Sequence, residues 1–138
     1  MPVVIGSYGA QFLQQNQIQS DLFPTIVFGS TKWVFTFATD TVDVLSLGGS
    51  AAAQEGSSGG GVVNAAGNLV GIITTSTVSG NTATRSLNAI TASYIRSDYR
   101  IDSGQEISTF LDTSPTISIA YFAPQIPQLE AQLTSQLH

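Results

Sequence analysis

Short apolar runs that end at glycine, asparagine or serine constrain the fold of this chain more than any other feature. The runs recur along most of the sequence, at residues 2–9, 17–28, 32–39, 41–47, 61–64, 69–77 and 82–90. Several of them alternate apolar and polar residues, which is the period of a strand with one buried face. Many short strands separated by turn residues predict an all-β barrel or sandwich.

The run at 32–39 shows the alternation clearly. Trp33, Phe35 and Phe37 fall on one face of the expected strand, and Val34 and Thr36 fall on the other. Large aromatic side chains are on average well buried in folded proteins. We therefore expect the three aromatic residues to belong to the core of the barrel.

A helical period follows the last strand run. In ITASYIRSDYRI, residues 90–101, the side chains of Ile90, Tyr94 and Ile101 share one helical face, which predicts a helix that closes the domain. Beyond it lies a tail with three prolines, and in residues 127–137 a leucine recurs every four residues, which predicts a narrow amphipathic helix. The chain is thus expected to form a barrel with its helix over 1–102 and a tail over 103–138.

Composition fits one small domain and excludes several classes of partner. The chain has 138 residues, of which 42% are hydrophobic and 9% charged, so it can bury one core. Its net charge is −5, and its only cations are scattered, at Lys32, Arg85, Arg96 and Arg100. Because nucleic acids and anionic membranes bind clustered basic residues, neither is an expected partner.

Other residue types exclude further chemistry. No cysteine is present, so we expect neither disulfides nor a thiolate metal site, and no cofactor. Asp40, Asp43 and Glu55 lack the spacing of a catalytic carboxylate pair and are expected to be solvated turn or edge residues. No segment approaches a membrane span, and the first residues lack the pattern of a signal peptide, so the sequence predicts a soluble chain with no assigned compartment.

The stretch GSSGGG at residues 56–61 is the strongest functional signal. Four glycines in six residues fit a flexible linker, an anion-binding loop or a nucleophile turn. Strand residues follow at once, which disfavours a linker, and no lysine and helix follow, which disfavours a Walker-type phosphate loop. The lipase-type nucleophile turn also leads into a helix. A turn between two strands, with a serine exposed at its crest, remains.

At these residues the chain resembles a known family. GSSGGGVVN, followed by GNLVGI, resembles the nucleophile segment of the trypsin/chymotrypsin-like serine peptidases. IGSYG resembles the entry strand of that family's second barrel, and LNAITASYI resembles the last strand and its C-terminal helix. The matches occur in the right order over residues 3 to 100. The resemblance implies a six-stranded Greek-key antiparallel barrel, one half of a double barrel, with a C-terminal helix.

The resemblance also implies a site. Ser58 takes the position of the nucleophile, and the backbone N–H groups of Gly56 and Ser58 take the positions of the oxyanion hole. The substrate-binding positions fall on residues before the nucleophile and on the strand after LVGI, namely Ala52, Ala53, Thr74, Thr75 and Ser76. No carboxylate lies at the base of this pocket. We therefore expect aliphatic substrate side chains, with a polypeptide as the substrate.

Two departures from the family limit the expected activity. The family takes its histidine base and its aspartate from the first barrel, whereas the only histidine here is His138, at the end of the tail. Ser57 stands where the family usually has an aspartate before the nucleophile. Because that aspartate pairs with the new N-terminus of a cleaved zymogen, its absence disfavours activation by such cleavage. We expect a separate N-terminal barrel half to supply histidine and aspartate, and the chain alone to be inactive. The alternative is a non-catalytic barrel module that serves binding or assembly.

Overall fold

The computed structural model describes residues 1–9, 23–37, 40–48, 50–76, 80–81 and 84–136. The chain divides into two compact units, Met1–Ser97 and Asp98–His138. The sequence predicted a boundary at residue 102, and the division lies earlier, within the helix α2 (Ala92–Ser103). The two units are described separately below.

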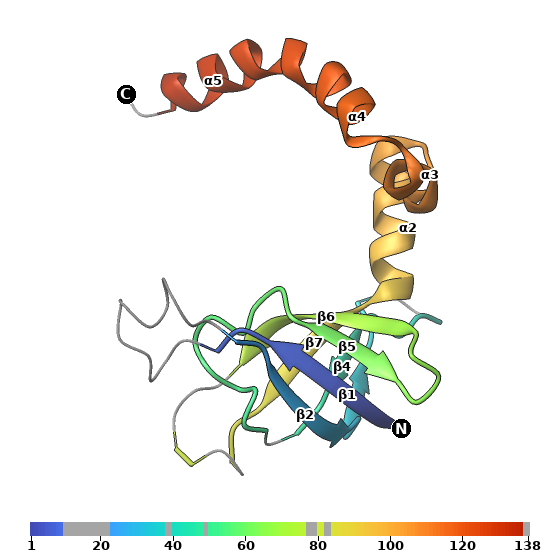
Figure 1. The fold of residues 1–138 in the computed structure, drawn as a ribbon, viewed down its shortest axis with the longest axis vertical. Coiled ribbons are helices and arrows are strands. Elements are labelled where there is room, and N and C mark those ends of the chain that lie inside the picture. The colour runs from blue at the N-terminus through green and yellow to red at the C-terminus, as the bar shows by residue number, and fades with distance from the viewer. Residues whose placement is uncertain (10–22, 38–39, 49, 77–79, 82–83, 137–138) are drawn as a thin grey trace. The chain divides into compact units, whose positions relative to one another are not determined.

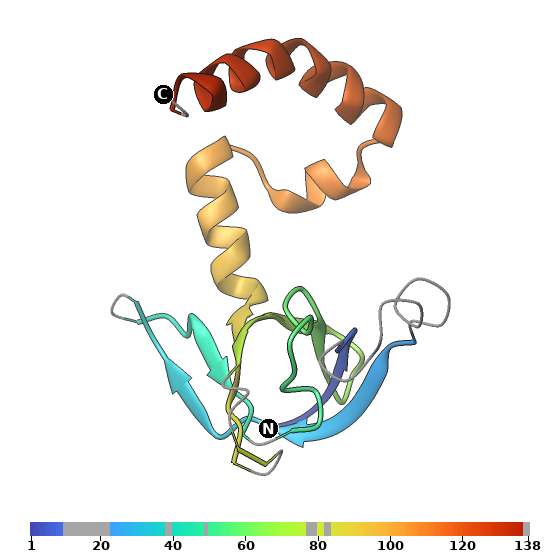
Figure 2. The same cartoon turned by 90° about the vertical axis from the view of Figure 1, so that its left-hand side faces the viewer.

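The first unit is a single antiparallel sheet that curls into a half-barrel (Figures 1 and 2). Its strands stand in the order β2-β1-β5-β6-β7-β4-β3. They are β1 (Pro2–Ser7), β2 (Thr25–Ser30), β3 (Trp33–Phe35), β4 (Val44–Ser46), β5 (Gly61–Asn64), β6 (Leu69–Ser76) and β7 (Leu87–Thr91). The predicted antiparallel β architecture is confirmed for this unit as a curled half-barrel, and the sheet has seven strands where six were expected.

The core lies on the concave side that the alternation of the strands predicts. Alternate residues of β1 and β7 are buried, so that Val3, Ile5, Leu87 and Ala89 face the same interior. The other buried apolar residues are Leu45, Leu47, Ala52, Ala53, Val62 and Ile73. Because successive side chains of a strand point to opposite faces, one sheet needs only its curl to enclose these residues.

The aromatic residues of β3 and Phe37 just after it contradict the prediction that they fill the core. Trp33, Phe35 and Phe37 expose 70%, 54% and 64% of their surface. The cause is topology: β3 stands at the end of the sheet and pairs only with β4, so no second strand covers it. The Phe37 ring packs edge-on against Tyr94, with centroids 5.3 Å apart.

The predicted closing helix is present, and it begins at Ala92 instead of Ile90. Ile90 belongs to β7, where it pairs with Val44 and Ile72. The hydroxyl of Thr91 accepts the N–H of Tyr94 at 3.1 Å and donates to the carbonyl of Val42 at 2.7 Å. Such a cap marks the first turn of a helix, so the chain changes from strand to helix at Thr91.

The second unit is helical through most of the stretch predicted as a loose tail. It contains the end of α2, then α3 (Ile107–Asp112), α4 (Pro115–Phe122), the 3₁₀ helix η1 (Ala123–Gln125) and α5 (Ile126–Ser135). The prolines at 115, 124 and 127 each lie in the first turn of a helix, where the missing N–H costs no hydrogen bond. The predicted C-terminal helix corresponds to α5, and Leu137 and His138 lie outside the described residues.

The helices of this unit pack no residue into a core. None of the residues in α3, α4, η1 or α5 is buried. Within the described part of the chain, no helix combines the length and the apolar character needed to cross a bilayer.

Candidate nucleophile loop

The glycine-rich segment forms the connection between β4 and β5. Gly56 and Gly59 take positive φ angles of 87° and 86°, which let the backbone reverse twice around Ser57 and Ser58. Gly60 lies against β1, where an added Cβ would stand 2.5 Å from the carbonyl oxygen of Gly6. The glycines therefore serve backbone geometry, as the sequence predicted.

Backbone hydrogen bonds fix this loop to β6. The N–H of Gly59 donates to the carbonyl of Ile73 at 2.8 Å, and the N–H of Ile73 donates to the carbonyl of Gly60 at 2.8 Å. Ser58 stands exposed at the turn, and its hydroxyl donates to the carbonyl of Thr74 at 3.2 Å. The side chain of Ser58, the predicted nucleophile, is therefore exposed to solvent. The two residues that follow it, Gly59 and Gly60, are hydrogen-bonded to the central strand β6.

The amides of the loop fall into two groups. Ser57 donates its N–H to the carbonyl of Gln54 at 3.2 Å, and Gly60 donates its N–H to the carbonyl of Ser57 at 3.0 Å. For Gly56 and Ser58, no acceptor is present among the described residues. Within residues 56–60, these two amides, which the resemblance assigns to the oxyanion hole, are the ones without an acceptor in the described part of the chain.

Ser57 and Ser58 differ in their exposure to solvent and in their hydrogen bonds. It is 1% exposed, and its hydroxyl has no hydrogen-bond partner among the described residues. A buried, unpartnered hydroxyl costs free energy and has no access to substrate. The loop thus holds one serine inside and one outside, and only Ser58 is placed for chemistry.

The predicted substrate-binding residues lie on two segments next to the loop. Ala52 and Ala53 have no exposed surface and belong to the core, where the N–H of Ala52 donates to the Ser50 hydroxyl at 3.1 Å. Thr74 is exposed, and its carbonyl accepts the hydroxyl of Ser58. Thr75 and Ser76 pair through β6 with β7, and their side chains lie outside what the structure describes.

Arg85 is the residue of this region that sequence reasoning missed. Its side chain is 7% exposed; Nη1 donates to the carbonyl of Ala53 at 3.0 Å and Nε to that of Gly80 at 3.2 Å. The signal was present in the sequence, because Arg85 stands two residues before Leu87 and four before Ala89. Strand alternation extended backwards by one step puts all three on the buried face.

Of the three acidic residues expected to be exposed to solvent, two are exposed and one is buried. Asp40 and Glu55 are exposed, as predicted, but Asp43 is 1% exposed. Its carboxylate accepts the hydroxyl of Thr36 at 3.2 Å and that of Thr41 at 3.1 Å, together with the N–H of Phe37. Asp43 therefore binds the segment after β3 to the start of β4. The described residues contain no group of three His, Cys, Asp or Glu side chains arranged to hold a metal ion.

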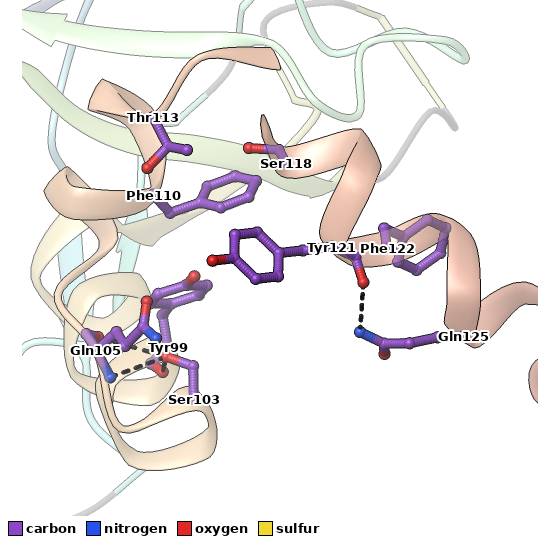
Figure 3. Close-up of a pocket in the computed structure, with 9 residues that line it drawn as sticks. All are labelled: Tyr99, Ser103, Gln105, Phe110, Thr113, Ser118, Tyr121, Phe122 and Gln125. Carbon is purple, nitrogen blue, oxygen red and sulfur yellow. Dashed lines mark hydrogen bonds between the residues drawn. The ribbon is translucent and has the colours of Figure 1, made fainter. Parts of the chain in front are cut away.

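A separate cavity of about 580 Å³ lies within the helical unit (Figure 3). It is lined by Tyr99, Ser103, Gln105, Phe110, Thr113, Ser118, Tyr121, Phe122 and Gln125. The rings of Tyr99 and Phe110 lie 6.0 Å apart, and the amide of Gln125 donates to the carbonyl of Tyr121 at 3.2 Å. The lining offers aromatic faces, hydroxyls and amides, and no charged side chain. Such a surface can bind a ligand, but it contains no base or nucleophile pair.

Comparison with known proteins adds no relative: no protein-family model, no curated protein and no solved structure matches the chain.

Proposed function

We propose that this chain is the nucleophile-bearing half of a trypsin-like serine endopeptidase, which hydrolyses peptide bonds through an acyl-enzyme on Ser58. The observation that carries the proposal is the pattern of amides around Ser58. Among the described residues, the N–H groups of Gly56 and Ser58 have no acceptor, while that of Ser57 between them donates to Gln54. Two preorganised donors beside an exposed hydroxyl are what the stabilisation of a tetrahedral oxyanion requires.

The order of the strands supports the same proposal. The long connection that contains Ser58 leads from β4 to β5, strands β5, β6 and β7 then follow one another as neighbours, and β7 pairs with β4. Three consecutive strands with a fourth placed by a long connection have the topology of a Greek key. The proposed six-stranded barrel then consists of β1, β2, β4, β5, β6 and β7, with β3 as an additional edge strand.

The proposed reaction proceeds in two steps. The Ser58 oxygen attacks the scissile carbonyl carbon while a base takes its proton, and the N–H groups of Gly56 and Ser58 bind the oxyanion that forms. Collapse breaks the C–N bond, and the leaving amine receives the proton from the base. Water then attacks the acyl-enzyme by the same route and releases the acid and the Ser58 hydroxyl.

The base belongs to a partner in this proposal. The described residues contain no histidine, and the Ser58 hydroxyl donates to a carbonyl, which accepts a hydrogen bond but cannot take the proton at neutral pH. Ser58 alone therefore stays a weak nucleophile. A partner barrel half that carries histidine and aspartate supplies the base and its orientation, as in the family that the sequence resembles.

Labelling with a fluorophosphonate tests this function. The chain alone is expected to react negligibly, and the chain joined to a barrel half that carries histidine and aspartate is expected to react at Ser58. Ser58→Ala should abolish labelling, whereas the matched variant Ser57→Ala should leave it unchanged, because the Ser57 hydroxyl is buried. Peptide mapping by mass spectrometry identifies the labelled serine.

A non-catalytic barrel module is the second candidate. The exposure of apolar side chains on both terminal strands of the sheet favours it, since Ile26 and Phe28 on β2 and Trp33 on β3 are all more than half exposed. Surfaces of this kind often serve association. Failure of the joined chain to label at Ser58, with the Gly56 and Ser58 amides still free, would favour the module over the enzyme.

A further inference from the structure

Aromatic side chains of the helical unit surround a cavity instead of packing into a core. The cavity has a volume of about 580 Å³, and rings from α2, α3 and α4 line it (Figure 3). Phe110 exposes 49% of its surface and Tyr121 76%, and no residue of α3, α4 or α5 is buried. The faces of these rings are therefore partly uncovered. Concave sites of roughly 300–1,000 Å³ with aromatic linings are the usual sites of small ligands.

Several polar groups of the lining are free to bind a ligand. Four side chains that line the cavity have no hydrogen-bond partner among the described residues, and these are Gln105, through its amide, and Tyr99, Ser118 and Tyr121, through their hydroxyls. The other two hydroxyls of the lining are engaged. Ser103 donates to the carbonyl of Tyr99 at 2.6 Å, and Thr113 donates to that of Thr109 at 2.7 Å. The free groups can both donate and accept hydrogen bonds.

The lining is also uncharged. It contains no Asp, Glu, Lys or Arg, and the neighbouring side chains of Arg100 and Glu106 lie 3.6 Å from each other and do not line the cavity. A charged ligand would lose hydration here without gaining an opposite charge. An apolar ligand would displace water from the free hydroxyls and the amide without replacing its hydrogen bonds, which costs free energy. The cavity therefore favours a neutral ligand that has both apolar surface and hydrogen-bonding groups.

From these properties we propose that the cavity binds a neutral carbohydrate. A pyranose ring has C–H groups on its faces, which can pack on aromatic rings, and hydroxyls around its rim, which donate and accept hydrogen bonds. In Figure 3 the Tyr121 ring points toward Phe110 and Tyr99, so that one sugar ring can contact an aromatic face and a free hydroxyl together. Sugar binding would be a second function of the chain, independent of hydrolysis at Ser58.

Titration of the full chain with trisaccharides, followed by ¹⁵N NMR, tests sugar binding. The neutral probes are maltotriose, cellotriose and triacetylchitotriose; trigalacturonic acid is the charged match, and indole is an apolar ring. At about 10 mM, at least one neutral probe should shift the backbone amides of Gln105, Phe110 and Tyr121 and leave that of Tyr8, in the first unit, in place. Trigalacturonic acid and indole should bind at least about 10-fold more weakly.

Matched variants place the sugar in the cavity. Tyr121→Ala should weaken binding of the neutral probe about 3- to 10-fold, whereas Tyr8→Ala, which removes an exposed tyrosine outside the cavity, should not change it. Gln105→Ala should weaken binding by a similar factor, and Gln132→Ala, on α5 and outside the lining, should have no effect. If Tyr121→Ala disturbs the helices, Tyr121→Phe decides, because it keeps the ring and should weaken binding about 3-fold through the lost hydroxyl alone.

Three results would overturn the proposal. The first is that no neutral trisaccharide shifts the amides of the lining. The second is tighter binding of indole or of trigalacturonic acid, because the cavity would then select an apolar or a charged ligand. The third is sugar binding of unchanged strength in Tyr121→Ala or Tyr121→Phe and in Gln105→Ala, because the sugar would then bind elsewhere on the chain.

Discussion

The two units of this chain use their apolar residues in opposite ways. In the first unit (Met1–Ser97, here called the barrel unit), ten of the described apolar residues are buried and form one cluster inside the curled sheet. In the helical unit, α3, α4 and α5 bury none, and residues such as Leu111, Ile119 and Leu133 are more than 60% exposed. A sheet that curls supplies the second wall of its own core, whereas short helices need another surface against which to pack.

The presence of a packed core in only one unit also determines where reactive side chains can be held rigidly. Ser58 belongs to the first unit, where its hydroxyl donates to the carbonyl of Thr74, and the neighbouring Gly59 and Gly60 are hydrogen-bonded to Ile73 of β6. The cavity of the helical unit is lined by helices that bury no residue and carry hydroxyls and amides. Precise catalytic geometry requires rigid support, which only the first unit provides.

The largest expected difference between the two units is the loss of unfolding free energy when an apolar side chain is truncated in each. Ile5→Ala removes a fully buried side chain and should lower the free energy of unfolding by about 2–5 kcal/mol, the cost of a core cavity. Leu133→Ala removes an exposed one and should change it by less than about 0.5 kcal/mol. Urea unfolding followed by circular dichroism measures both. Equal losses would mean that the helical unit packs against a surface as apolar as the barrel core.

A second test concerns backbone packing at Gly60. Gly60→Ala places a methyl group 2.5 Å from the Gly6 carbonyl oxygen and 2.8 Å from the Cβ of Ser7, so β1 and the nucleophile loop must separate. We expect a loss of about 1–3 kcal/mol, as for an overpacked core. Gly104→Ala in the helical unit is the control: its Cβ would meet nothing within 4 Å. Because Gly104 has a positive φ of 70°, alanine there is strained locally within the helical unit. The comparison therefore uses only the free energy of unfolding of the barrel unit in each variant. Unaltered barrel stability in Gly60→Ala would contradict the contact with β1.

A third test compares two aspartates, one in each unit. Asp43→Ala removes the acceptor of two threonine hydroxyls and of the Phe37 N–H, and should cost about 1–3 kcal/mol. Asp112→Ala, at an exposed position of α3, should fall within about 0.5 kcal/mol of the parent chain. Thermal unfolding gives the difference. The structural role of Asp43 is refuted if the two variants melt together.

The smallest expected effect falls on Ser57. Because its hydroxyl is buried without a partner in the described part of the chain, Ser57→Ala should be neutral or stabilising by up to about 1 kcal/mol. Ser58→Ala should also be near neutral, since its hydroxyl is exposed and makes one hydrogen bond. The pair thus separates stability from reactivity. A loss above 1 kcal/mol in Ser57→Ala would mean that its hydroxyl has a partner.

Local patterns predicted most of the barrel unit. Alternation and turn residues indicated the strands, and the glycine cluster indicated a strand-to-strand turn with Ser58 exposed, because both depend on neighbours in sequence. The aromatic face of Trp33 and Phe35 was misplaced because burial of an alternating strand depends on whether another strand covers it. That is a property of sheet order, and β3 proved to be an edge.

Long-range contacts account for the rest. The burial of Asp43 depends on hydroxyls from both sides of its turn, and that of Arg85 on a carbonyl 32 residues away. Neither is visible in composition. In the helical unit, the sequence predicted a tail with three prolines and one amphipathic helix at 127–137, whereas Pro115, Pro124 and Pro127 each lie at the first or second position of a helix. Proline is compatible with the first turn of a helix as well as with a loop. The prolines alone therefore could not show whether this stretch is helical.

The Ser58 loop as an oxyanion site is tested most directly by NMR with a peptidyl boronic acid, whose tetrahedral serine adduct mimics the reaction intermediate. At millimolar ligand, and with the chain joined to a barrel half that carries histidine and aspartate, the ¹⁵N–¹H resonances of Gly56 and Ser58 should shift, and that of Ser57 should stay nearly in place because its N–H is bonded to Gln54. The shifts should persist in Ser57→Ala and disappear in Ser58→Ala. A response centred on the Ser57 amide, or one retained in Ser58→Ala, would contradict the assignment of this loop as a nucleophile and oxyanion site.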